Sequence, residues 1–157
     1  MKSSPLYLDE FFLTKLNIKH VGSFEKSEEI TEQKYIVKVN YDVARNVNKK
    51  NMFRLDFRII IKPPKSSSGI SIDSEMLGFF SFPPKTPEED MQYLIRINGC
   101  AILYSLLRGQ VAMVTGTFPN GKVNIPTVVM QDMIKKKRRI KNSVTTKKEK
   151  SQNNYFK

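Results

Sequence analysis

The strongest constraint on the fold is a single change of hydrophobic period along the chain. In residues 35–43, and again in 53–61, an apolar or aromatic residue occupies every odd position. A period of two is typical of a β-strand with one buried face. A third strand is expected over residues 72–82. Short polar connections between three successive strands favour an antiparallel meander.

The segments on either side of this meander are less regular. Residues 7–12 are interpreted as a short helix or turn and residues 13–20 as a strand, since they show no single period. From Thr86 the apolar residues follow a helix, whose start is indicated by a Thr86 cap, Pro87 and a capping box completed by Glu89. Asn98-Gly99 predicts a kink or break, because glycine costs a helix ~1 kcal/mol.

A last amphipathic helix is expected to open at Pro126 or Thr127. Strands followed by helices indicate an α+β fold with the helices on one face of the sheet. No apolar run approaches the ~20 residues of a membrane-spanning helix, and no secretory signal is visible. With a single cysteine, Cys100, these features suggest a reducing, cytoplasmic location.

The positive charge is concentrated at the C-terminal end. The chain has 157 residues and a formal net charge of +12, and 10 of its 27 Lys and Arg residues lie in residues 135–157 with one acid, Glu149. We therefore predict a single domain over residues 1–134 and a basic, largely disordered tail over 135–157. The run that opens the tail either ends a helix or forms an electrostatic arm for nucleic acid or an acidic protein. It consists of Lys135, Lys136, Lys137, Arg138 and Arg139.

The sequence contains few candidate catalytic residues. There is one histidine, His20, and one cysteine, and this count argues against a zinc site within a single chain. The glycines at 116 and 121 lack the Lys-Ser/Thr ending of a phosphate-binding loop. The acids at 88–90 are explained by helix capping. We therefore expect a protein that is not an enzyme and has no metal or cofactor.

Aromatic residues are the more informative feature. Phe80 and Phe82 share one face of an extended chain, and Phe79 takes the other. Both faces of this strand are therefore apolar. Such faces either pack on helices and an oligomer partner, or leave an apolar groove exposed for another chain.

Four stretches together resemble the SecB family of export chaperones. They are Glu75–Phe82, Asn98–Arg108, Gly116–Pro119 and Val123–Pro126. The resemblance covers about residues 35–134 in element order. Two departures stand out, because Ser105 replaces the family proline after the helix aromatic and Gly109 replaces the glutamate after the helix arginine.

The resemblance implies a four-stranded antiparallel sheet with two helices packed on one face, and a homotetramer built as a dimer of dimers. It also implies ATP-independent holding of unfolded or partly folded clients, in protein export or as guardian of an antitoxin. Six residues would then lie near a client-binding groove or an oligomer interface: Phe79, Phe80, Phe82, Leu103, Tyr104 and Leu107. The strand polar faces carry mixed charge, which counts against docking of the translocase ATPase on an acidic face.

Two alternatives stay open. An antitoxin-specific SecB-like chaperone or assembly adaptor would have one or a few defined partners. A nucleic-acid-binding module would use the basic tail, and its binding would weaken steeply with salt.

Overall fold

The computed structural model describes residues 4–21, 35–63, 69–118 and 123–134. The chain forms two compact units, residues 1–127 and residues 128–157. The first unit contains the sheet and the long helix, and the second begins with a turn of helix at residues 130–134. The boundary expected at residue 134 stays a prediction, and the basic run at 135–139 lies outside the described residues.

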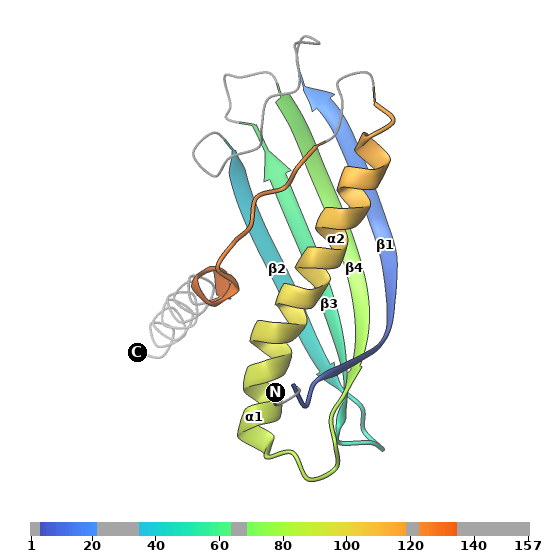
Figure 1. Ribbon diagram of the computed structural model, residues 1–157, viewed down its shortest axis with the longest axis vertical. Coiled ribbons are helices and arrows are strands. Elements are labelled where there is room, and N and C mark those ends of the chain that lie inside the picture. The colour runs from blue at the N-terminus through green and yellow to red at the C-terminus, as the bar shows by residue number, and fades with distance from the viewer. Residues whose placement is uncertain (1–3, 22–34, 64–68, 119–122, 135–157) are drawn as a thin grey trace, which may run out of the picture. The chain divides into compact units, whose positions relative to one another are not determined.

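Four strands form one antiparallel sheet in the order β1-β4-β3-β2. They are β1 (Tyr7–Val21), β2 (Ile36–Arg45), β3 (Met52–Lys62) and β4 (Gly69–Ser81). The meander expected from the alternating residues is confirmed as β2, β3 and β4. β1 returns to pair with β4, so β1 and β2 are the two edges of the sheet (Figure 1).

The helix or turn predicted near residues 7–12 is wrong, because β1 already begins at Tyr7. β1 pairs with β4 along its length, but register shifts leave Asp9 and Thr14 as extra residues. Each such bulge moves the following side chains to the opposite face of the sheet. A strand interrupted in this way shows no single period, which is why its sequence did not indicate a strand throughout.

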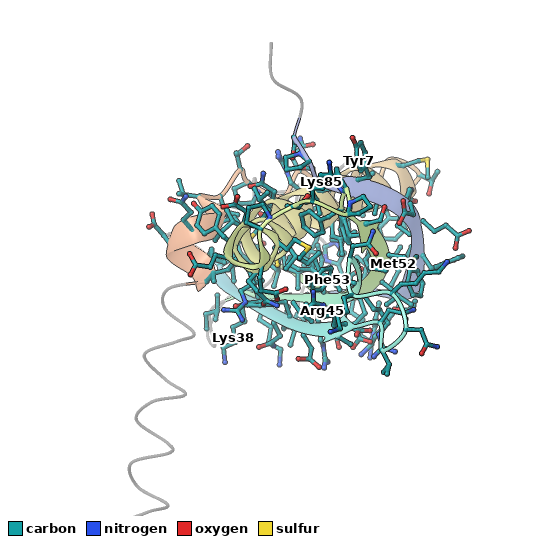
Figure 2. The ribbon with its side chains drawn as sticks, turned by 90° about the horizontal axis from the view of Figure 1, so that it is seen from below. Tyr7, Lys38, Arg45, Met52, Phe53 and Lys85 are labelled. Atoms are coloured by element: carbon teal, nitrogen blue, oxygen red, sulfur yellow. The ribbon has the colours of Figure 1, made fainter. Side chains whose placement is uncertain are left out.

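One face of the sheet forms the core. Odd positions of β3 and even positions of β4 are buried, as the alternation predicts. Figure 2 shows Phe53 between the sheet and the helices, and Lys38 on the side away from them. The largest fully buried side chains of the two central strands are Leu55, Phe57, Ile59, Ile61, Ile72, Met76 and Phe80.

The helical segment has three parts, α1 (Glu88–Leu94), a π-helical turn η1 (Ile95–Gly99) and α2 (Cys100–Thr115). The start at the acidic residues is confirmed, but the predicted cap is wrong. The N-cap residue is Pro87, and no side chain caps the helix. Instead Arg45 of β2 donates two hydrogen bonds to the Glu88 carboxylate, at 3.0 and 2.8 Å, and fastens α1 to the sheet.

The break predicted at Asn98-Gly99 is a π-helical turn through which the helix continues. A Cβ at position 99 would lie 3.1 Å from Leu55 Cδ2. Glycine therefore lets the helix approach the sheet closely at this turn. Gly78 has the same effect from the β4 side, because a Cβ there would lie 2.9 Å from Leu103 Cδ2.

By length and composition alone, the 28-residue helix Glu88–Thr115 is apolar enough to cross a membrane. Core helices of soluble proteins meet the same criteria. The residues of this helix that pack on the sheet, among them Ile95, Leu103 and Leu107, are fully buried.

After α2, residues 123–127 run extended against the helix. The Tyr104 hydroxyl donates a 2.6 Å hydrogen bond to the Pro126 carbonyl oxygen. The last helix predicted to open at Pro126 or Thr127 begins only at Met130. The α+β fold, with a four-stranded antiparallel sheet and helices on one face, is confirmed (Figure 1).

Candidate functional site

Five of the six aromatic and apolar residues predicted for a groove or interface lie in the core of this chain. They are Phe80, Phe82, Leu103, Tyr104 and Leu107. Phe79 lies on the opposite face of β4 and is partly exposed. The alternation of these phenylalanines is therefore as expected. Their role in client binding or at an oligomer interface stays a prediction, and of the six only Phe79 is partly exposed.

Half of the ten exposed large apolar side chains of the described residues lie on β1. Five large apolar side chains of this strand are at least one-third exposed: Tyr7, Phe11, Phe12, Leu13 and Val21. Phe12 is 50% exposed and Phe11 is 41% exposed. Sequence reasoning missed this cluster because residues 7–12 were not interpreted as a strand. The sequence feature that indicates this cluster is the density of aromatic and apolar residues among the first 13 positions.

These side chains occupy both faces of the strand. Phe12 pairs with Leu77 of β4, and its ring meets Phe79 edge-on, with 6.5 Å between the centroids and an angle of 81°. Phe11 lies on the helix side, opposite Gly78. The packing of α2 is against β3 and β4. Because the helix does not extend fully over β1, the helix-side residues of this edge are only partly covered.

β1 is also an edge in the hydrogen-bonding sense. Within the described part of the chain it pairs with β4 on one side, and no strand pairs with its other side. The outward N–H and C=O groups of such an edge can template a further strand. An extended polypeptide added there would gain backbone hydrogen bonds and apolar contacts on both faces.

The centre of the face away from the helices is charged rather than apolar. Arg58 donates from Nε and Nη2 to the two carboxylate oxygens of Asp73, each at 2.8 Å, and Lys15 donates to Oδ2 at 2.6 Å. The hydrogen bond from Arg58 is the main reason that the pKa of Asp73 is lowered to about 2. Glu75 joins the cluster at 3.2 Å from Arg58 Nε.

A shallow cleft of about 220 Å³ adjoins this cluster. Its charged side chains are Asp42, Asp56, Arg58 and Glu75. Asp56 accepts a 3.0 Å hydrogen bond from Arg54. Charges of both signs therefore alternate over this face, in agreement with the mixed polar faces inferred from the sequence.

Among the described residues, no group of three or more His, Cys, Asp and Glu side chains is placed to hold a metal ion. Cys100 is fully buried in the core, where a thiol is inert. The apolar edge is therefore the most distinctive surface of the described residues.

Comparison with known proteins gives no match to a family model and none among curated proteins. Among solved structures, 11 chains match. One is the SecB-like chaperone Rv1957 of Mycobacterium tuberculosis, solved in complex with a ChAD peptide from the Rv1956 HigA1 antitoxin. It is 12% identical, with a TM-score of 0.58 over 79% of this chain and 88% of that one. A protein of unknown function from Streptococcus agalactiae is 9% identical over 78% of this chain and 97% of that one, and its TM-score of 0.43 supports no conclusion.

The first of these likenesses shows that the chain has a SecB-like fold. The resemblance inferred from four stretches of sequence is confirmed at the level of the fold.

Proposed function

We propose, on the premise of a SecB-like fold, that this protein is a chaperone of the holdase type. It would bind unfolded or partly folded polypeptides without ATP, and it would be a binding protein rather than an enzyme. The SecB-like chaperone of Mycobacterium tuberculosis was solved with a bound antitoxin peptide, which supports a polypeptide as the ligand.

The observation that carries this proposal is the exposure of apolar side chains on both faces of the β1 edge. An aromatic side chain has ~150–250 Å² of surface. Covering a further ~100 Å² of Phe12 or Phe11 contributes ~2.5 kcal/mol before the cost of ordering the client. Several such contacts along one strand suffice for reversible holding of an extended segment.

The proposal also covers the oligomeric state and the cellular role. We propose the homotetramer that the resemblance to the SecB family implies. We propose action in the cytoplasm, either in protein export or on a dedicated client such as an antitoxin. The balanced charge of the sheet face gives no support to docking of the translocase ATPase.

Suppression of aggregation tests the central proposal. A chemically unfolded client would be diluted into buffer without ATP, with and without the full-length protein, and light scattering followed. We expect suppression at a small molar excess of chaperone. Phe12→Ser should raise the concentration needed, whereas Val47→Ser should not, since Val47 is 91% exposed in the connection between β2 and β3. If the wild type suppresses nothing at several-fold excess, the proposal is wrong.

The mass of the native assembly distinguishes client binding at the β1 edge from self-association at the same edge. We expect an assembly of four 18.2 kDa chains for the wild type and for Phe12→Ser. If Phe12→Ser dissociates the assembly, β1 is an interface between copies, and the client surface lies elsewhere.

The alternative of a dedicated chaperone or adaptor has its own outcome. One partner retained from a lysate, with no protection of unrelated unfolded clients, would favour that alternative over a general holdase.

A further inference from the structure

A second pocket lies between α2 and the extended residues 123–127, away from the β1 edge. It has a volume of about 260 Å³ and is lined by Ser105, Arg108, Gly109, Ala112, Asn124 and Ile125. None of these residues belongs to a strand. This volume is below the ~300 Å³ at which pockets for drug-sized ligands begin. It therefore suits a small group or the end of a chain rather than a nucleotide.

Arg108 supplies the charge of this pocket. Its Nε donates a 2.7 Å hydrogen bond to the Ile125 carbonyl oxygen, which fixes the plane of the guanidinium. Among the described residues, neither terminal nitrogen of Arg108 is hydrogen bonded to a protein group. A fixed guanidinium with its two terminal nitrogens available matches the two oxygens of a carboxylate.

The elements that border this pocket supply no acidic residue. α2 contains no Asp or Glu, and neither do residues 123–127. No described carboxylate forms a salt bridge with Arg108. The side chain is nevertheless partly buried. A partly buried charge that no described carboxylate pairs with favours binding of an anion.

Gly109 keeps the pocket open. It lies inside α2, where glycine is less favourable than any residue except proline. A Cβ at this position would meet no atom within 4 Å. Close packing within this chain therefore does not require glycine here. Its missing side chain leaves space beside Arg108, which the Ser105 hydroxyl and the Asn124 amide border as further hydrogen-bond donors.

We propose that this pocket binds a carboxylate group, held by the terminal nitrogens of Arg108 beside Gly109. Two sources share this chemistry, the C-terminus of a polypeptide and an Asp or Glu side chain. The site is separate from the β1 edge, so its occupancy is measured independently of aggregation suppression.

The test uses the full-length, isotope-labelled protein and small probes. N-acetylglycine represents a C-terminal carboxylate, and the α-amide of N-acetylglutamate represents a side-chain carboxylate. N-acetylglycinamide is the neutral control, and inorganic phosphate is the competing anion. Ionic strength is matched throughout, because the basic residues 135–157 attract any anion. The resonances of Arg108 Nε–H and of the Ser105 and Gly109 amides report binding at the pocket.

We expect saturable shifts of these resonances with at least one carboxylate in the millimolar range, and none with the neutral amide. Shifts with only one of the two carboxylates identify the source and support the proposal. Equal shifts with the neutral amide, tighter binding of phosphate than of either carboxylate, or no saturable shift would each overturn it.

A variant that fills the pocket provides the matched comparison. Gly109→Leu retains Arg108 and raises helix propensity, so it should fold and lose carboxylate affinity at least ~10-fold. Met113→Leu, at an exposed position of the same helix, should bind as the wild type does. Unchanged affinity in Gly109→Leu overturns the proposal. A second result would also overturn the proposal. If the wild type binds no carboxylate and Gly109→Leu changes the native mass, the pocket is occupied by a second copy of the chain.

Discussion

The backbone N–H of Val123 donates a 2.8 Å hydrogen bond to the hydroxyl oxygen of Thr115. The same hydroxyl donates at 2.7 Å to the Val111 carbonyl oxygen one turn earlier, and Thr115 is fully buried. One side chain thus satisfies a helix carbonyl and fixes the start of the extended residues 123–127. Together with Tyr104 and Arg108, it fastens this segment to α2.

Replacing Thr115 by valine should lower the free energy of unfolding by ~1–3 kcal/mol, because the buried Val123 N–H loses its acceptor. Valine has nearly the same shape, so packing is retained. Urea denaturation measures the loss, and hydrogen exchange of the Val123 amide should accelerate.

Thr117→Val is the matched control for this change. The Thr117 hydroxyl also donates to a carbonyl oxygen, that of Val114 at 2.8 Å, but it is exposed. Its loss should change stability by less than ~0.5 kcal/mol. Equal effects of the two substitutions would contradict the importance of burial at Thr115.

Two glycines should respond to alanine in opposite directions. Gly78→Ala should destabilise the protein by ~1–3 kcal/mol, because the new Cβ would lie 2.7 Å from the Phe80 ring and 2.9 Å from Leu103, both fully buried. Gly109→Ala should stabilise it by up to ~1 kcal/mol, since its Cβ meets nothing within 4 Å. Urea denaturation of both variants tests the contrast, and destabilisation by Gly109→Ala would contradict it.

The Arg58–Asp73 pair should be visible in a carboxyl titration. The folded protein holds the pKa of Asp73 at about 2, below its ordinary value of 3.8. A lowered folded pKa means that the stabilising contribution is complete above pH ~4, and is lost as the pH falls from ~4 to ~2. Carbon-detected NMR of the Asp73 carboxyl group measures this pKa directly.

Arg58→Gln should raise the pKa of Asp73 toward its ordinary value, because the largest lowering contribution is the hydrogen bond from Arg58. Lys15 remains, so the pKa should stay somewhat low. Arg54→Gln is the control, since Arg54 pairs with Asp56 instead. An unchanged pKa in Arg58→Gln would show that the pair does not form in solution.

The nucleic-acid alternative depends on the C-terminal residues. If the protein binds RNA or DNA, deletion of residues 135–157 should abolish binding, since it removes 10 Lys and Arg residues with one acid. The dissociation constant of the full chain should rise steeply with salt. Tight binding by the shortened chain would instead indicate a recognition surface on the sheet.

Strands with regular alternation were predictable, and the bulged strand was not. β2, β3 and β4 keep a period of two over most of their length, so their faces follow from the sequence. β1 contains extra residues at Asp9 and Thr14, which exchange its faces twice. A bulge depends on the register with the partner strand, and register is a property of two segments far apart in the sequence.

The candidate site likewise combines features that the local sequence predicts with features that depend on distant contacts. Alternation alone placed Phe79 and Phe80 on opposite faces. Which face is covered depends on where α2 crosses the sheet, and this helix buries Phe80 while Phe12 meets Phe79 on the other side. The pocket beside Arg108 likewise depends on residues 123–127 returning along the helix.

By itself, the sequence determined the α+β class, the faces of the central strands, the start of the long helix and the concentration of positive charge in residues 135–157. These are consequences of local periodicity and composition. Tertiary packing determines which aromatic residues are buried and which stay exposed on β1, and it places Arg108 beside Gly109 with no salt bridge to a described carboxylate. Burial and pairing of this kind depend on contacts between distant segments, which no local pattern encodes.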